Sequence, residues 1–472
     1  MNKLNKWIYG FSLLVIATLT RAFHLGREDF WLDEIYTLTR ATQPLQEVWS
    51  QIGAGLHLRY FIQDHILYRI WVTGGTTPGY VRILPLLFGL MSVWLIYRLT
   101  VLWSDETTGR WAGLWAAVSP LLIYYSQEAR GYTLWIFLYL ASLYSLSRLI
   151  QSSRKSDCFL YMLSSVLCIY VQVLGVFWVG IAGLVGWLWT ISIKDKKPWL
   201  PLITCQGGIL LFTLPWIYFL SRIPADGLEW IPSFSMKMLV DTFRVFTLGL
   251  FNNTQSLMVF WIQYGLWGIL CGTGFFLLIK NKKWDILLLL SAPLILLAAV
   301  SILYKPLYFT NRYTLLSLPL LIIGTCVGWR YLNSSRWLTI VGFTVLILSG
   351  VSLFYQFSTP QKTPWIKAIS SMDRQSNDIT PICVYPHYHD TVLKYHLGEK
   401  IPIRGIQTGN ITKLDMIDKI GASSEVWLFW VEDGSYNPVN PAEAWLTSHY
   451  SANTTFYQEQ PFPIRVIHYQ KR

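Results

Sequence analysis

Long apolar segments recur along most of this chain, and they constrain its fold more than any other feature. A helix needs roughly 20 mostly apolar residues to cross the hydrocarbon core of a bilayer. Such segments are predicted near residues 7–25, 80–102, 110–125, 132–150, 158–170, 172–192, 199–220, 257–279, 284–303, 314–330 and 336–356. Of the 472 residues, 53% are hydrophobic and only 14% charged, a composition typical of polytopic membrane proteins. The pattern predicts an α-helical membrane protein with about eleven transmembrane helices.

Basic residues are distributed unevenly between alternate loops. With the N-terminus placed inside, every inner connection carries Lys or Arg, beginning with Lys3 and Lys6 and then Arg98 and Arg110. This agrees with the positive-inside rule and predicts an integral membrane protein with a cytoplasmic N-terminus. The net charge of +12 lies in these loops and not on a soluble face. Membrane lipids are therefore expected partners, and nucleic acid is not.

The composition changes at about Ser358. The runs "TPICVYP", "SEVWLFWVE" and "FPIRVIHYQ" are typical of short strands, while "HYHDTVLKYHLG" and "NPAEAWLTSHY" favour helices. The sequence therefore predicts a transmembrane domain over 1–357 and a small α/β domain over 358–472, which an odd number of spans places outside the membrane. Neither the six cysteines nor the histidines of the tail have the spacing of a disulfide framework or a metal site.

The stretch "DFWLDEIYTL" follows the first apolar segment and contains Asp29, Asp33 and Glu34. These acids are either solvated at the interface or held there by their apolar neighbours to do chemistry. A carboxylate in such a place acts as a general base toward a hydroxyl or as a metal ligand. In an extended or turn segment, Asp33 and Glu34 point different ways. We expect one to do chemistry and the other to orient or bind, with Asp29 a solvated neighbour.

A second polar stretch, "YYSQEARGYTLW", lies in a short outer loop and contains Glu128 and Arg130. One interpretation is a structural ion pair or a helix cap. The other is that Arg130 binds phosphate through two parallel hydrogen bonds, while Glu128 orients Arg130 or a sugar hydroxyl. Tyr125 and Tyr132 would then donate hydroxyl groups or stack against a sugar.

The stretch "KPLYFTNRYTLLSLP" places two cations, Lys305 and Arg312, on the outer side, where the positive-inside rule disfavours them. They bind either an anionic ligand or lipid headgroups.

In the first long outer loop, "GAGLHLRYFIQDH" contains His57 and Arg59. Arg59 is a candidate for phosphate contact, while His57 is either a packed or a functional histidine. The residues that follow have the periodicity of a helix lying in the interface, with Asp64 and His65 on its polar face.

Four stretches together resemble glycosyltransferase family 39, the bacterial relatives of protein O-mannosyltransferases and lipid A aminoarabinose transferases. They are "RAFHLGREDFWLDEIYTL", "VRILPLLFGLMSVWLIYRL", "LWAAVSPLLIYYSQEARGYTLW" and "NRYTLLSLPLLI", and they extend from residue 20 to about residue 320. The resemblance implies the GT-C fold and transfer of a monosaccharide, with inversion, from a polyprenyl-phosphate-linked donor. The acceptor, which is a lipid, a glycan or a protein, would be reached on the outer face.

The resemblance also implies roles for single residues. Asp33 is the base with Glu34 beside it, and Arg130 holds the donor phosphate with support from Arg312 and Arg59. His57 is also carried over to the donor site, but many relatives have His-Pro-Pro where this chain has His57-Leu58-Arg59, which weakens the transfer of that role. Because arginines can stabilise the departing phosphate, no cofactor is required, and the sequence gives no sign of a divalent metal.

Two other classes of protein compete with this prediction. A transporter or lipid flippase usually has ionisable groups near the bilayer midplane and repeated halves. Here the acids lie in outer loops, the spans are almost free of charge, and no repeat is visible. A non-catalytic scaffold is the other class, and it would not require Asp33, Glu128 and Arg130 to converge on one substrate.

Overall fold

The chain divides into two compact units. The computed structural model describes residues 3–53, 61–192, 198–222, 231–250, 256–332, 335–372, 380–398, 401–406, 423–432, 441–458 and 463–471. The first unit, here the helical unit, comprises Met1–Leu25, Gln43–Thr76 and Tyr80–Gln356. The second, here the mixed unit, comprises Gly26–Thr42, Thr77–Gly79 and Phe357–Arg472.

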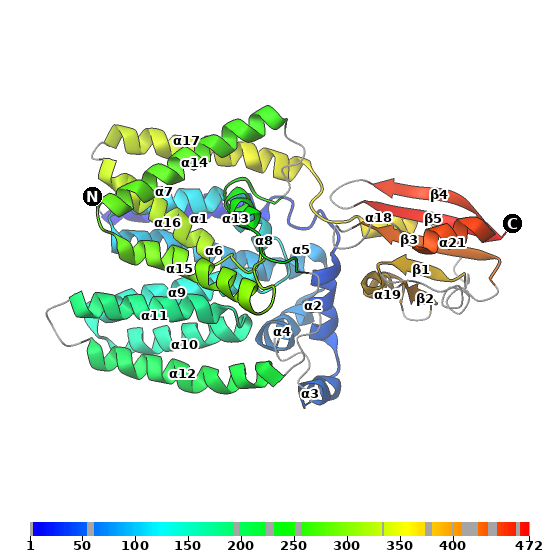
Figure 1. Ribbon diagram of the computed structural model, residues 1–472, viewed down its shortest axis with the longest axis horizontal. Helices are drawn as coiled ribbons and strands as arrows, with labels where there is room; N and C mark the ends of the chain where they lie inside the picture. Colours follow the sequence, from blue (N-terminus) through cyan, green and yellow to red (C-terminus); the bar gives the residue numbers. More distant parts are fainter. Residues whose placement is uncertain are drawn as a thin grey trace. The chain divides into compact units, whose positions relative to one another are not determined.

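The helical unit contains the apolar segments of the sequence. Its elements are α1 (Lys3–Ala22), α3 (Leu45–Gly53), the π-helix η2 (Phe61–Tyr68), α4 (Arg69–Trp71), η3 (Val72–Gly74), α5 (Pro78–Val81), α6 (Ile83–Trp103), α7 (Glu106–Val118), α8 (Pro120–Ser126), α9 (Tyr132–Ser152), α10 (Lys155–Val171), α11 (Gly175–Ser192), α12 (Trp199–Arg222), α13 (Met236–Leu248), α14 (Leu257–Lys280), α15 (Trp284–Leu303), α16 (Ser317–Trp329), η4 (Arg330–Leu332) and α17 (Ser335–Ser358). Helix α10 packs against both α9 and α12, and α11 packs against α9 and α15 (Figure 1).

Seven helices of the described residues are long and apolar enough to cross a membrane. They are Pro78–Trp103, Tyr132–Ser152, Gly175–Ser192, Trp199–Tyr218, Leu257–Lys280, Trp284–Leu303 and Arg336–Ser358. Shorter apolar helices occupy Trp7–Ala22 and Ser317–Leu332. The prediction of a polytopic α-helical membrane protein is confirmed, while the count of eleven spans stays a prediction.

The segment predicted as one span near 110–125 consists of two helices. Helix α7 ends at Val118, and α8 begins at Pro120 after Ser119, whose backbone is extended. A proline cannot donate the hydrogen bond that would continue α7, and it disfavours helical geometry in the residue before it. The break leaves carbonyl groups at the end of α7 that need donors from elsewhere in the unit.

Close packing in this unit depends on small residues. A Cβ atom on Gly328 of α16 would lie 2.1 Å from the carbonyl oxygen of Gly274 in α14. The two helices therefore meet backbone to backbone, as membrane helices do where glycines face each other.

One pair of cysteines departs from the sequence-based expectation. A disulfide joins Cys158 of α10 to Cys205 of α12. The two residues are 47 positions apart, and only the packing of α10 against α12 brings them together.

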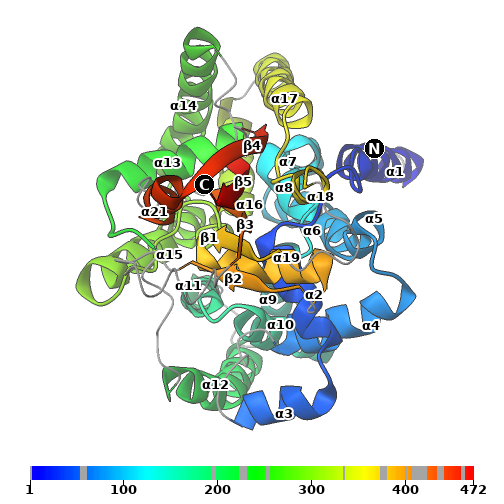
Figure 2. The same cartoon turned by 90° about the vertical axis from the view of Figure 1, so that its right-hand side faces the viewer.

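The mixed unit is built on a five-stranded sheet with the strand order β2-β1-β3-β5-β4 (Figure 2). The strands are β1 (Ile382–Tyr385), β2 (Ile403–Gly405), β3 (Glu425–Val431), β4 (Tyr450–Gln458) and β5 (Ile464–Lys471). Strand β1 is parallel to β2 and β3, whereas β5 is antiparallel to β3 and β4. The three predicted strands are present. The sequence did not predict β2, which is short, or β4, whose residues are mostly polar and exposed.

Both faces of the sheet are covered. The helices of this unit are α2 (Leu32–Thr42), α18 (Trp365–Ser370), η5 (His387–His389), α19 (Asp390–Leu397) and α21 (Pro441–His449). Leu446 of α21 packs on one face with Leu428 and Tyr469, whereas Trp365 of α18 stacks near Phe429 on the other. This alternation explains why every residue of β3 after Glu425 is buried.

Helix α2 belongs to this unit although it lies more than 300 residues before the sheet in the sequence. It packs against α19, and the Tyr36 hydroxyl donates to the carbonyl oxygen of Tyr388 at 3.4 Å. The unit begins again at Phe357, next to the predicted boundary. The division into a transmembrane and an outer domain stays a prediction.

Candidate functional site

Asp33 and Glu34 lie in the first turn of α2, so the prediction of an extended or turn segment was wrong. Two acids in the first turn compensate the positive end of the helix dipole. Glu34 is also the third residue of the helix, and its carboxylate accepts from the backbone N–H of Trp31 at 3.4 Å. This contact is one half of a capping box. The apolar residues around the acids are compatible with a helix, and the two acids stabilise its N-terminus.

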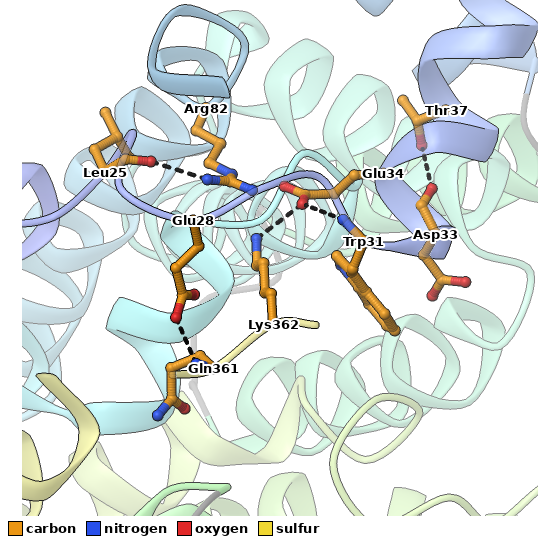
Figure 3. A network of polar contacts seen from close by, with 9 residues as sticks. All are labelled: Leu25, Glu28, Trp31, Asp33, Glu34, Thr37, Arg82, Gln361 and Lys362. Carbon is orange, nitrogen blue, oxygen red and sulfur yellow. Dashed lines mark hydrogen bonds and ion pairs between the residues drawn. The ribbon is translucent and has the colours of Figure 1, made fainter. Parts of the chain in front are cut away.

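Glu34 is completely buried and forms an ion pair. Its Oε2 lies 2.9 Å from Nζ of Lys362, and the two side chains are 0% and 5% exposed (Figure 3). Sequence reasoning missed Lys362. The rule that singled out Lys305 and Arg312 could have found it, because Lys362 also follows a predicted span on the side predicted to be outside.

Asp33 has a different environment from its neighbour. Its residue is half-buried, and its carboxylate points away from that of Glu34 (Figure 3). The carbonyl oxygen of Asp33 accepts from the Thr37 hydroxyl at 3.3 Å. Burial raises the pKa of the nearby Tyr36 hydroxyl, and the charges of Asp390 and Asp33 raise it further. Asp33 is therefore partly exposed as a residue, although its Oδ2 is buried, whereas Glu34 is completely buried.

Two further acids of the segment Gly26–Thr42, here the acid segment, also contact the tail. Asp29 accepts from the backbone N–H of Ile366 at 2.9 Å. Glu28 accepts from the backbone N–H of Gln361 at 2.5 Å (Figure 3). Asp29 is therefore an anchor of the segment, and the prediction that it is only a solvated neighbour was wrong.

In the helical unit, the buried Arg21 supports the second polar stretch. Its guanidinium donates to the carbonyl oxygens of Ala116 and Ala117 at 3.1 and 2.9 Å, and to the Ser126 hydroxyl at 3.2 Å. These carbonyl groups are the ones exposed by the break after α7. Gln127 in turn donates from its side chain to the carbonyl oxygens of Arg21 and Phe23 at 2.8 and 2.6 Å. Ser126 and Gln127 are therefore structural.

Glu128 and Arg130 lie in the loop that follows, Gln127–Gly131, here the Glu-Arg loop. Glu128 is 1% exposed and Arg130 is half-buried. Tyr132, also buried, begins α9 and packs its ring against Tyr125 at 4.9 Å. The same Tyr125 donates its hydroxyl to the carbonyl oxygen of Asn311 at 2.9 Å. The fold therefore ties α8, which leads into the Glu-Arg loop, to the stretch that contains Arg312.

Lys305 and Arg312 both lie in the non-helical stretch between α15 and α16. Each has an aromatic neighbour: the Arg312 guanidinium is 5.7 Å from the ring centre of Phe309, and the Lys305 ammonium is 5.7 Å from that of Tyr304. Both residues are half-buried. An anionic ligand and a lipid headgroup remain the two interpretations of these cations.

The first long loop differs from its prediction. His57 and Arg59 lie outside the described residues. Asp64 and His65 are buried in η2, so their assignment to a solvated polar face was wrong. The π-helical backbone buries Gln63 as well, and a Cβ atom on Gly131 would lie 2.0 Å from its side-chain oxygen. A side chain at 131 would therefore force the Gln63 side chain to move from its place beside the Glu-Arg loop.

The structure assigns each candidate to one unit. Asp33 and Glu34 lie in the mixed unit, whereas Glu128, Arg130, Tyr132, Lys305 and Arg312 lie in the helical unit. Within the described ranges, no group of three or more His, Cys, Asp or Glu residues has the arrangement of a metal site. Convergence of the two sets on one substrate stays a prediction.

No family model matches the sequence, and neither does any curated protein. Solved structures do match. ArnT from Cupriavidus metallidurans in the apo state aligns over 98% of both chains with a TM-score of 0.55 and 11% identity. The chain has the GT-C fold. It is an integral membrane protein.

Two more structures with this fold are similar. ArnT from Cupriavidus metallidurans bound to undecaprenyl phosphate aligns over 99% of this chain and 98% of its own, with a TM-score of 0.53 and 12% identity. The arabinofuranosyltransferase AftD from Mycobacteria aligns over all of this chain but only 40% of its own, with a TM-score of 0.55 and 14% identity. The expected GT-C fold is confirmed, and membership of family 39 stays a prediction.

Proposed function

We propose that this protein is a membrane glycosyltransferase. It moves a monosaccharide from a polyprenyl-phosphate-linked donor to an acceptor on the outer face of a bacterial plasma membrane, with inversion. The observation that carries the proposal is the full-length alignment with ArnT, one structure of which is bound to undecaprenyl phosphate. A polyprenyl chain buries much apolar length, and a protein within the membrane can receive it without exposing it to water.

Asp33 is the base of the proposed reaction. An acceptor hydroxyl attacks the anomeric carbon and passes its proton to the Asp33 carboxylate, while the bond between that carbon and the phosphate oxygen breaks. Such proton transfer contributes about 10²–10⁴-fold to a rate. Glu34 takes the orienting role, because its carboxylate is fully buried and occupied by the Lys362 ammonium.

Arg130 and Arg312 stabilise the negative charge that develops on the departing phosphate. Loss of one such preorganised donor costs roughly 3–4 kcal/mol in the transition state. The hydrogen bond from Tyr125 to Asn311 supports a joint role, because it links the two stretches that contain these arginines. Glu128 and Tyr132 are assigned to the sugar, and Lys305, with Arg59, to the phosphate or a lipid headgroup.

The test is turnover of lipid-linked sugars by the purified full-length protein. It is placed in lipid nanodiscs with radiolabelled monosaccharides on undecaprenyl phosphate, one sugar at a time, together with cell-envelope extract as acceptor. Release of undecaprenyl phosphate together with label in a new product is the expected result. No release from any donor contradicts the proposal.

The same donors distinguish enzyme from flippase. In sealed proteoliposomes, a flippase moves the intact lipid-linked sugar to the opposite leaflet, where an added impermeant reagent detects it. The proposed enzyme consumes the donor without moving the intact molecule. Movement without consumption assigns the chain to transport.

A further inference from the structure

One short stretch of chain carries three of the polar contacts between the acid segment and the tail. The backbone N–H of Gln361 donates to Glu28 and the Lys362 ammonium to Glu34 (Figure 3). The backbone N–H of Ile366 donates to Asp29. The three acceptors flank Asp33 on both sides in the sequence. This stretch therefore fixes the backbone on which Asp33 stands.

Among these contacts the Lys362–Glu34 pair is the one that involves two full charges. Lysine and glutamate side chains are almost never fully buried unless they are paired. Removing one partner of a buried pair is strongly destabilising, since the remaining charge has lost its compensation, whereas removing both is often tolerated. Glu34 also accepts from Trp31 at the start of α2, so the pair acts on the first turn of the helix itself.

We propose that Lys362 is a positioning residue for the transfer reaction. It fixes the Glu34 carboxylate, and through it the first turn of α2, so that Asp33 is presented to the acceptor in a single orientation. The inference rests on the proposed function, because it gives Lys362 a role through the proposed base. It also makes the C-terminal tail part of the active enzyme and not a separate module.

The alternative is that the pair only holds the mixed unit together. The two roles differ in what a substitution changes. If the pair only stabilises the mixed unit, its loss lowers the folded fraction, whereas the loss of a positioning residue lowers kcat of the folded enzyme. A misplacement of about 1 Å at a reacting group can cost on the order of 100-fold in rate.

The experiment compares full-length variants in nanodiscs, each corrected for its folded fraction. We expect K362M to lower kcat by about 10- to 100-fold while the donor KM stays within about twofold. K362R keeps a cation for Glu34 and is expected to restore most of kcat. Because the two residues act as one unit, E34Q/K362M is expected to be no slower than either single variant. The matched control is K367M, which removes an exposed lysine of the adjacent helix α18 and is expected to leave kcat unchanged.

Two results would overturn the proposal. One is a wild-type kcat in folded K362M, and the other is a folded K362R that is as slow as K362M, since the charge would then not be responsible. If K362M does not fold, E34Q/K362M replaces it, and a wild-type kcat there has the same meaning.

Hydrogen exchange separates this proposal from the proposed function. In K362M, the amides of the first turns of α2 are expected to exchange faster than in the wild type, and unchanged exchange contradicts the positioning role. If the wild-type protein transfers no sugar at all, the proposed function fails, while the exchange rates still decide whether Lys362 fixes this turn.

Discussion

The acid segment and the Glu-Arg loop are both short polar stretches beside apolar helices, but they are held in opposite ways. The acid segment is bound by Gln361, Lys362 and Ile366, all more than 320 residues away in the sequence. The Glu-Arg loop is held from α1, through Arg21 and Gln127. In the first, carboxylates accept from one lysine and two backbone N–H groups, whereas in the second, side chains donate mainly to backbone carbonyl groups. A change in the tail should therefore affect only the first, and a change in α1 only the second.

The largest expected effect is at the base in the acid segment. Asp33→Asn keeps the size of the side chain but removes the proton acceptor, so transfer should fall by about 10³-fold or more with the protein still folded. The measurement is initial rate with a lipid-linked sugar in nanodiscs.

The matched control for that substitution is Asp29→Asn. An asparagine oxygen still accepts from the Ile366 N–H, so the anchor stays and the rate should be close to wild type. A wild-type rate for Asp33→Asn, or equal losses for both variants, would remove Asp33 from the role of base.

The second effect tests the Glu-Arg loop. Arg130→Met removes a cation from the proposed phosphate site and should slow transfer by about 10²-fold. Arg148→Met is its control, since Arg148 lies at the other end of α9, where it pairs with Asp157 at 3.8 Å. A rate for Arg130→Met equal to that of its control would leave the loop with a structural role only.

The third prediction concerns the stability of the fold and not the rate of sugar transfer. Arg21→Met leaves the buried carbonyl group of Ala116 without the Arg21 donor and that of Ala117 with the Thr20 hydroxyl alone, which should lower the free energy of unfolding by about 1–3 kcal/mol. Thermal melting in detergent is the measurement. Arg98→Met, at an exposed position of α6, should change stability by no more than about 0.5 kcal/mol. Equal melting of the two variants would show that α1 does not support the loop.

The comparison also explains what could be predicted from the sequence. Apolar segments and short β-rich runs depend on local composition, so most long apolar helices and the strands β1, β3 and β5 were correctly predicted. The break between α7 and α8 and the helix α2 were not. The acids were located, but their partners were not, because a lysine 328 residues away has no local signature. The burial of Asp64 was missed for a related reason, since a π-helix does not follow the periodicity of an α-helix.

The smallest expected effect is a pH dependence in the mixed unit. Burial lowers the pKa of His396 in α19, and the charge of Asp29 opposes this shift only in part. The unfolded chain therefore takes up a proton near the ordinary value of about 6.5, while the folded unit resists it until a lower pH. Stability should accordingly fall as the pH drops below about 6.5.

In His396→Asn this loss of stability should be smaller, whereas His387→Asn, at an exposed position, should behave like the wild type. The loss of stability is measured by hydrogen exchange of the α19 amides. Exchange rates are compared between about pH 7.5 and about pH 5.5, which is roughly one unit below the ordinary histidine pKa. An acid sensitivity that is identical in wild type and His396→Asn would show that the protonation of His396 does not contribute to it.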